Sequence, residues 1–143
     1  MEEFRIIIAG GRDFYNLPLV TEKIDNLISI KRKTHKIVIV SGKAKGADTC
    51  GEVYAKLNNF NVKEFPVKWI WENGKCINKS AGYKRNCDMA DYGHACVCFW
   101  DGKSRGTAHM ISIAMKRNMP LRVYNYKGVP YEIETIKNII NKS

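Results

Sequence analysis

Nowhere does the 143-residue sequence hold the roughly 20 consecutive apolar residues that a membrane-spanning helix requires, so we expect no membrane span. The chain begins with the acidic segment Met1-Glu2-Glu3-Phe4, which lacks the basic and apolar regions of a secretory signal. The five cysteines form no paired framework, which indicates reduced thiols in a cytoplasmic protein. Cys96-x-Cys98 has no second pair at zinc-finger spacing, and we expect no bound metal.

The familiar phosphate-loop motifs are also missing. The segment Gly42-Lys43-Ala44-Lys45-Gly46-Ala47-Asp48 is no Walker A loop, because no Gly-Lys-Ser/Thr ends it, and it does not match Gly-x-Gly-x-x-Gly. Internal repeats, low-complexity segments and linkers are absent from the sequence as well. We therefore expect one domain that spans residues 1–143.

Acidic residues are few relative to basic ones, 14 against 24, which gives a formal net charge of +10. Such a charge favours an acidic partner, and a nucleotide, a nucleic acid or mere solubility would each account for it. The one basic run, Lys31-Arg32-Lys33, lies where a helix is expected to end, and cations are favourable at that position. Charge alone therefore does not choose among these interpretations.

Short apolar runs alternate with segments of helical spacing along the whole chain. Five such runs predict β-strands at residues 4–9, 36–41, 62–67, 95–99 and 120–124. Pro66 places the third of them at an edge of the sheet or at a strand end. The alternation predicts an α/β fold with a mostly parallel sheet of about five strands and helices on both of its faces.

The helices between these runs have features that can be checked. Asn16 is expected to cap the first helix, with Pro18 in its first turn. The helix after the second strand is expected to bury Ala47, Cys50, Val53, Tyr54 and Leu57. Residues 68–79 are expected to form a loop, in which Trp69 and Trp71 are either packed in the core or available for stacking on a base.

A glycine-rich turn follows the first, second and fourth expected strands. In a parallel sheet the carboxyl ends of the strands share one edge, and ligands bind there near the point where the strand order reverses. Free N–H groups at the start of the following helices favour an anion, most naturally a phosphate. The candidate ligand-binding residues are Gly10, Gly11, Arg12 and Asp13 in the first turn; Ser41, Gly42, Lys43, Gly46 and Asp48 in the second; Arg85 and Asn86 in the helix before the fourth strand; and Trp100, Asp101, Gly102, Ser104, Gly106 and Thr107 in the third turn.

The residue types suggest roles within such a site. Arg12 and Arg85 can neutralise a phosphate with their forks of donors. Either Asp48 or Asp101 can accept a hydrogen bond from a ribose hydroxyl, although Asp48 also suits the dipole of the helix that it begins. Two side chains are candidates for contact with a base, Trp100 and Tyr83, and one of Ser104 and Thr107 is expected to cap the helix after the third turn.

These motifs together resemble the SLOG superfamily of Rossmann-like proteins, and within it the YspA-type, cpYpsA-related branch of bacteria and phages. The resemblance rests on Gly10-Gly11-Arg12-Asp13-Phe14, on Ser41-Gly42 with Gly46-Ala47-Asp48, on Ala81-Gly82 with Arg85-Asn86 and Met89, and on Trp100-Asp101-Gly102 with Ser104 and Gly106-Thr107. Lys43 departs from the branch, which usually has a glycine there. The resemblance implies a single Rossmann-like three-layer domain, a nucleotide-derived ligand without a further cofactor, and a homodimer.

The superfamily also contains the Lonely guy phosphoribohydrolases, which cleave a base from a nucleoside monophosphate. Arg85-Asn86-Cys87-Asp88-Met89 resembles one of their two signature elements, and Gly102 with Gly106-Thr107 resembles the other. Their glutamate, however, corresponds to Met110, which can neither stabilise positive charge nor activate water. If the protein is an enzyme of this kind, Arg85 grips the phosphate and Asp48 or Asp101 acts as the acid or base.

The resemblance thus implies three functions in order of preference. The first is binding of a nucleotide or ADP-ribose-type molecule by a sensor or sequestering protein, which could act in phage or bacterial defence or counter-defence. The second is nucleoside monophosphate phosphoribohydrolase activity. The third is nucleic-acid binding like that of DprA, another member of the superfamily, against which the lack of a basic stripe with interleaved aromatic residues counts.

Overall fold

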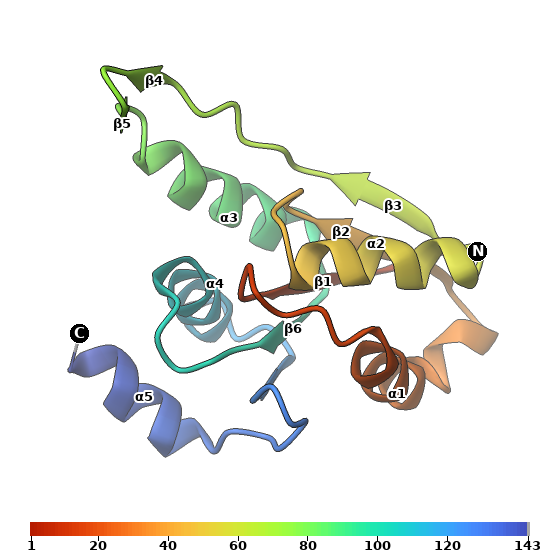
Figure 1. Ribbon diagram of the computed structural model, residues 1–143. Coiled ribbons are helices and arrows are strands. Elements are labelled where there is room, and N and C mark those ends of the chain that lie inside the picture. Colours follow the sequence, from red (N-terminus) through yellow and green to blue (C-terminus); the bar gives the residue numbers. More distant parts are fainter. Residues whose placement is uncertain (143) are drawn as a thin grey trace.

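The computed structural model describes residues 1–142 and has three layers, a sheet between two layers of helices (Figure 1). All neighbouring strands of the main sheet are parallel, in the order β3-β2-β1-β6-β7. The strands are β1 (Glu3–Gly10), β2 (Lys36–Ser41), β3 (Asn61–Glu64), β6 (Ala95–Phe99) and β7 (Leu121–Tyr124). The helices are α1 (Leu17–Ile28), α2 (Ala47–Leu57), α3 (Ser80–Tyr92), α4 (Arg105–Lys116) and α5 (Ile133–Asn141), with a short 3-10 helix, η1 (Lys31–Lys33). The predicted α/β class is therefore confirmed.

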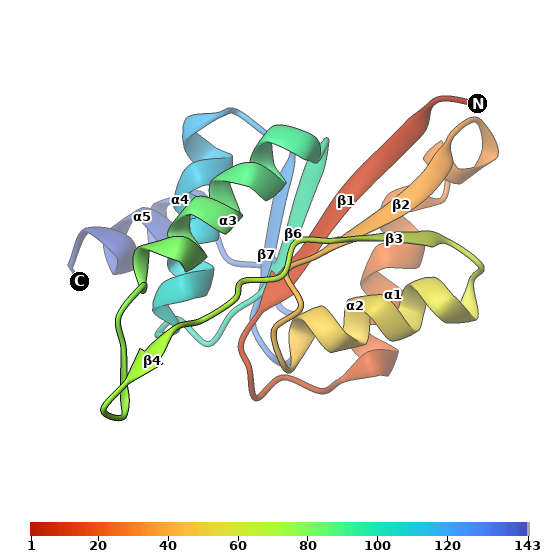
Figure 2. The ribbon, with the colours of Figure 1, turned by 90° about the horizontal axis from the view of Figure 1, so that it is seen from above.

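The alternation of side chains along the strands builds the two helical layers. In β1, Ile6 and Ile8 belong to the core that α1 and α2 cover, whereas Ile7 and Ala9 belong to the core beneath α3, α4 and α5. Figure 2 shows the two groups of helices on opposite sides of the sheet. Because successive strand residues point to opposite faces, a buried central strand must be apolar at nearly every position, as β1 is from Ile6 to Ala9.

The strand order reverses between β1 and β6. The chain adds β2 and β3 on one side of β1 and then crosses back through α3 to form β6 on the other side (Figure 2). The carboxyl ends of the two strands stay in register, with Gly10 opposite Phe99. Loops that leave these two ends must diverge, which opens a crevice at this edge. The predicted edge position of the third strand is also confirmed, since β3 is at the margin of the sheet and ends at Glu64, before Pro66.

The helices agree with the sequence in some details and differ in others. Asn16 Oδ1 accepts a hydrogen bond from Leu19 N at 3.1 Å, which confirms the predicted cap of α1. The prediction that α2 buries Val53 and Leu57 is wrong, because these side chains are 40% and 69% exposed. The buried face of α2 repeats at three or four residues from Ala47, and Val53 falls outside that stripe, whereas Leu57 is the last residue of the helix. Over residues 1–142, the helices are too short or too polar to span a lipid bilayer.

Residues 68–79 contain a second, two-stranded sheet where the sequence analysis predicts only a loop. The strands β4 (Trp71–Glu72) and β5 (Lys75–Cys76) pair antiparallel around Asn73 and Gly74, whose φ angles are +51° and +77°. Two consecutive positive φ angles are typical of a type I′ hairpin turn, and Asn-Gly is its preferred sequence. The hairpin stands away from the main sheet, beyond the start of α3 (Figures 1 and 2).

Candidate functional site

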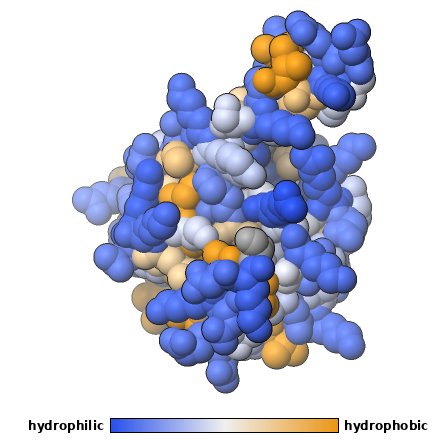
Figure 3. Space-filling view, turned by 90° about the vertical axis from the view of Figure 1, so that its left-hand side faces the viewer, coloured by the Kyte–Doolittle hydropathy of each residue, from blue (hydrophilic) through white to orange (hydrophobic). Residues whose placement is uncertain are grey.

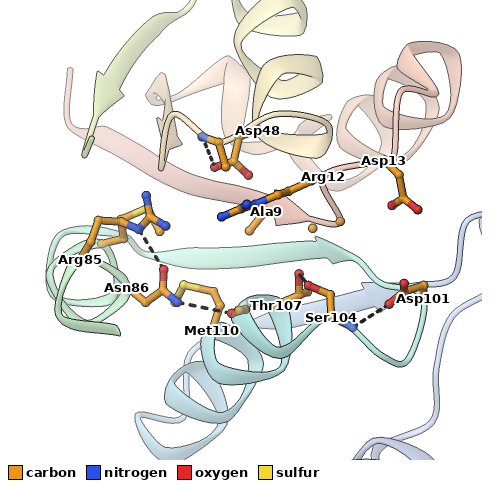
Figure 4. Close-up of a pocket in the computed structure, with 15 residues that line it drawn as sticks. Ala9, Arg12, Asp13, Asp48, Arg85, Asn86, Asp101, Ser104, Thr107 and Met110 are labelled. Carbon is orange, nitrogen blue, oxygen red and sulfur yellow. Dashed lines mark hydrogen bonds between the residues drawn. The ribbon is translucent and has the colours of Figure 1, made fainter. Parts of the chain in front are cut away.

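A cavity of about 520 Å³ opens at the edge where β1 and β6 end. Figure 4 shows its wall, to which all three glycine-rich turns and α3 contribute. The lining residues are Ala9, Gly10, Gly11, Arg12, Asp13, Ala44, Asp48, Arg85, Asn86, Met89, Asp101, Ser104, Gly106, Thr107 and Met110. We call this cavity the main pocket. Residues of all three turns therefore line one cavity, as the sequence predicts.

Backbone hydrogen bonds join the first turn both to the end of β6 and to the second turn. Gly11 N donates to Phe99 O at 3.1 Å, and Ala47 N donates to Gly11 O at 3.2 Å. Gly46 has a φ of +81°, and a Cβ at that position would lie 2.2 Å from Gly11 O. Only a residue without a side chain fits there. Gly46 thus brings the two turns together without lining the main pocket itself.

The third turn leaves the start of α4 open. Asp101 Oδ1 accepts hydrogen bonds from Lys103 N and Ser104 N, both at 2.8 Å, so this carboxylate shapes the turn. Ser104 occupies the N-cap position of α4, as one of the two predicted alternatives, but its side chain makes no capping hydrogen bond among the described residues; its Oγ lies 3.1 Å from Thr107 Oγ1. Gly106, in the first turn of α4, has open space where a Cβ would be. A ligand can therefore approach the backbone N–H groups of this helix start.

Arg85 is fixed in position by main-chain and side-chain acceptors. Its Nη1 donates to Gly42 O and, at 3.2 Å, to Phe65 O, while its Nε donates to Asn86 Oδ1 at 3.0 Å. The Asn86 amide in turn lies 3.4 Å from Gly106 O, which links α3 to the start of α4. The guanidinium is thus oriented before any ligand arrives, and Asn86 acts as its positioning residue.

The main pocket is lined by two guanidinium groups, of Arg12 and Arg85, and by three carboxylates, of Asp13, Asp48 and Asp101, of which Asp48 is the buried one. Asp48 is 5% exposed, and its Oδ2 accepts a hydrogen bond from Ala44 N at 3.2 Å. Burial raises the pKa of Asp48 to about 6, although that backbone bond and the charge of Arg85 oppose the rise. Burial also lowers the pKa of Arg85, which the nearby charge of Arg12 lowers further. In Figure 4 the Arg12 side chain extends across the cavity between Asp48 and the start of α4.

Comparison with known proteins identifies the family. Residues 4–70 match the YspA, cpYpsA-related SLOG family. The Gene 61 protein of Mycobacterium phage D29 is 30% identical over 132 residues, which cover 88% of this chain and 98% of the phage protein. The chain belongs to the YspA, cpYpsA-related SLOG family. The resemblance inferred from the motifs is thereby confirmed.

Solved structures of DNA processing protein A (DprA) share the fold of this SLOG protein. DprA from Streptococcus pneumoniae superposes with a TM-score of 0.65 and 16% identity, over 99% of this chain and 55% of that one. DprA from Helicobacter pylori gives a TM-score of 0.61 and 19% identity, over 97% of this chain and 79% of that one. The chain thus spans little more than half the length of the pneumococcal protein, and at these identities the likeness concerns the fold.

Several predicted ligand-binding residues of the SLOG protein shape the turns without lining the main pocket. Trp100 is 1% exposed, and its Nε1 donates to Ser104 O at 3.1 Å, so of the two candidates for contact with a base Tyr83 is the more accessible. Ser41 is buried, and its Oγ donates to Glu52 Oε2 at 2.5 Å. Gly102 provides a φ of +80° within the third turn. These residues stabilise the turns that form the main pocket and do not line it.

Lys43 lies in a neighbouring cleft rather than in the main pocket. Its Nζ is 2.8 Å from Glu52 Oε1 and 3.0 Å from Glu64 Oε2, and both glutamates raise the pKa of this lysine. Its φ of +60° is in the left-handed region, which explains why a glycine suits this position in the SLOG branch. Gly42 lines the same cleft, together with Arg12 and Arg85.

The apolar part of the main-pocket wall comes from residues outside the predicted site, namely Ala9, Ala44, Met89 and Met110. Met110 is 1% exposed and follows Gly106 by one helical turn, so the helical period places both on one face of α4. The same spacing relates Met89 to Arg85 on α3. This period is the signal by which the sequence could have pointed to the two methionines as pocket residues.

Proposed function

We propose that this SLOG protein binds a nucleotide or ADP-ribose-type small molecule and acts as its sensor or sequestering protein. One observation carries the proposal: the open N-terminus of α4 and the guanidinium groups of Arg12 and Arg85 meet in one preformed cavity. Backbone N–H groups at a helix start and arginine forks are the two donor types that bind phosphate best in proteins. A phosphate group in the main pocket contacts both.

Asp48 supplies the acceptor for the sugar. It is the buried carboxylate of the main pocket, and its Oδ2 accepts a hydrogen bond from Ala44 N at the rim of the second turn. Asp101 and Asp13 also line the main pocket but are exposed. Asp101 Oδ1 accepts bonds within its own turn, and Asp13 Oδ1 accepts from the hydroxyl of Tyr126 at 2.6 Å. A ribose hydroxyl that donates to Asp48 would replace part of the hydration that burial removes.

The test is mass spectrometry of small molecules released by denaturing the purified protein, followed by calorimetric titration with the released compound. We expect a phosphate-containing nucleoside derivative that binds the wild-type protein, and binding that weakens at least about tenfold in Arg85→Lys, because one ammonium group cannot both donate to Gly42 O and Phe65 O and reach the phosphate. If no released compound contains phosphate, and a panel of nucleoside mono- and diphosphates and ADP-ribose shows no binding, the proposal is refuted.

Phosphoribohydrolase activity is the second candidate, and the pKa of Asp48 favours it. A carboxyl group with a pKa of about 6 is suited to general acid or base catalysis near neutrality. Against this activity, Met110, whose side chain is apolar, lies at the position where the Lonely guy phosphoribohydrolases have their glutamate. Incubation with nucleoside monophosphates, with chromatography of any freed base, separates the two functions. Base release that Asp48→Asn abolishes would establish the enzyme, and tight binding without release would establish the binding protein.

Single-stranded DNA is the third candidate, and it rests on the net charge of +10 and on the DprA fold. DprA from Helicobacter pylori binds single-stranded DNA. A protein that neutralises several DNA phosphates loses affinity steeply as salt rises, whereas one nucleotide in a pocket loses much less. An electrophoretic shift of an oligonucleotide at low salt, lost at about 200 mM salt, would support this candidate.

The biological setting that we propose follows from the phage relative. A phage-encoded protein that holds a host signalling nucleotide in the host cytoplasm would act in counter-defence. We further propose a homodimer, which light scattering of the purified protein tests directly.

A further inference from the structure

Beside the main pocket lies a second cavity of about 360 Å³, beneath the β4–β5 hairpin, which we call the hairpin pocket. Its distinctive members are three aromatic side chains that the main pocket does not use: Trp69, Trp71 and Tyr83. The remaining lining residues are Arg12, Cys76, Lys79, Gly82, Arg85, Asn86 and Gly106. Four of these, Arg12, Arg85, Asn86 and Gly106, also line the main pocket, so the two cavities share a wall.

The aromatic side chains are too exposed to be a closed core. Trp69, Trp71 and Tyr83 are 36%, 64% and 47% exposed, whereas Trp100 is 1% exposed. Figure 3 shows a segment that stands out from a mostly hydrophilic face and carries hydrophobic side chains, which are not the aromatic ones because the hydropathy scale of the figure gives tryptophan and tyrosine pale blue tones. Aromatic surface left open beside a charged cavity indicates a binding site rather than incomplete packing.

The hairpin nevertheless has a defined conformation. Asn78 Oδ1 accepts a hydrogen bond from Ile70 N at 2.8 Å, and its Nδ2 donates to Lys68 O at 3.0 Å. At the base of the arm, Trp69 packs on Gly82 of α3: a Cβ on Gly82 would lie 2.7 Å from the indole ring. A glycine at this point lets the ring lie on the helix. The hairpin is therefore held at its base by the packing of Trp69 on α3.

We propose that the hairpin pocket is the base-binding subsite of the nucleotide whose phosphate occupies the main pocket, with the base stacked on Trp71 and Tyr83. This inference rests on the proposed function and extends it to the class of ligand: a nucleoside phosphate with a planar base, purines before pyrimidines because their larger rings stack over more area. Indole and phenol rings stack on any base, and the shared wall of Arg12 and Arg85 carries the phosphate side of the same ligand.

The decisive comparison uses two probes that share the phosphate and the sugar but differ in the base: adenosine 5′-monophosphate (AMP) and ribose 5-phosphate. By titration calorimetry we expect the wild-type protein to bind AMP at least about tenfold more tightly than ribose 5-phosphate, which is within the range found for stacking of one base. Trp71→Ala should remove most of this difference while leaving the affinity for ribose 5-phosphate unchanged. Trp71→Leu, which keeps an apolar side chain but loses the flat ring, should behave like Trp71→Ala.

Tyr15→Ala is the matched control, because Tyr15 is 61% exposed and lines neither cavity. It should leave both affinities unchanged. If the wild-type protein binds both probes equally, or if Trp71→Ala and Trp71→Leu retain the preference for AMP, the base-binding subsite is refuted while the proposed function stands. If the wild-type protein binds neither probe, the phosphate site fails with it, and the two failures are thus distinguished. Circular dichroism establishes that each variant is folded.

Discussion

Replacing Asp48 with asparagine is expected to stabilise the protein at neutral pH by an amount that shrinks as the pH falls toward 4. The structural reason is the burial of this carboxyl group beside Ala44 at the start of α2, with 5% of the residue exposed. Burial penalises the charged form and raises the pKa from the ordinary value of 3.8 to about 6. Asparagine is nearly the same size, keeps an oxygen that can accept the bond from Ala44 N, and carries no charge to desolvate.

The sign and size of the effect follow from proton linkage. Between pH 3.8 and about 6 the folded protein binds more protons at Asp48 than the unfolded chain does, so this residue makes the wild-type protein less stable as the pH rises. The accumulated loss is less than about 1 kcal/mol at pH 4 and rises to about 3 kcal/mol above pH 7, which is the shift from 3.8 to about 6 converted to free energy. The variant lacks this loss, so the difference between the two unfolding free energies should grow with pH.

Urea unfolding at a series of pH values between 4 and 8, followed by tryptophan fluorescence, measures this difference. Subtracting the unfolding free energy of the wild-type protein from that of the variant at each pH cancels the contribution of every other titrating group. Asp88→Asn is the matched control, because Asp88 is an exposed carboxylate on α3, and its difference from wild type should be nearly constant with pH. A difference for Asp48→Asn that is flat, or that falls as the pH rises, would show that Asp48 is not desolvated and would refute the reasoning.

Three further predictions concern ligand contact, each measured by calorimetric titration with AMP. Gly106→Ala should leave the unfolding free energy unchanged or raise it by up to about 1 kcal/mol, since alanine favours helices. It should nevertheless weaken AMP binding at least about tenfold, because the added methyl group enters the main pocket. Unchanged binding would place the phosphate elsewhere. Arg85→Lys should weaken binding by a similar factor with little change in fold, because one ammonium group cannot both donate to Gly42 O and Phe65 O and reach the phosphate. An equal affinity would show that Arg85 does not contact the ligand. Lys43→Gly should leave the affinity within about twofold of wild type, because the Lys43 ammonium is bound to Glu52 and Glu64; a larger loss would mean that this cation reaches the ligand.

The sheet could be predicted from the sequence because its determinants are local. A central parallel strand must be apolar on both faces, and the run from Ile6 to Ala9 shows this directly. The cap of α1 at Asn16 is similarly local, since its donor, Leu19 N, is three residues away. Val53 and Leu57 are instead exposed. The prediction of their burial is wrong because an apolar residue type alone does not tell whether its side chain contacts the sheet.

The hairpin shows a different limit, because its signal is present in the sequence at Asn73-Gly74. The dipeptide predicts a tight turn with two positive φ angles, which the structure has. The flanking strands are only two residues each, Trp71–Glu72 and Lys75–Cys76, too short for an alternating pattern to stand out. The packing of Trp69 on Gly82 depends on how the chain returns from the hairpin to α3. No local sequence pattern encodes that path.

The charges around the main pocket explain why a total of +10 is a poor guide to a binding site. Lys43 adjoins the second glycine turn in sequence, yet Glu52 of α2 and Glu64 of β3 both bind its ammonium group, and these residues come together only when α2 has packed on the sheet. Arg12 has no ion pair among the described residues and extends into the cavity. A chain with the same composition could therefore have the same net charge and no phosphate site, because the field in the main pocket depends on which cations lack an acidic neighbour. Removing Arg12 should accordingly lower affinity far more than removing an equal charge at Lys43.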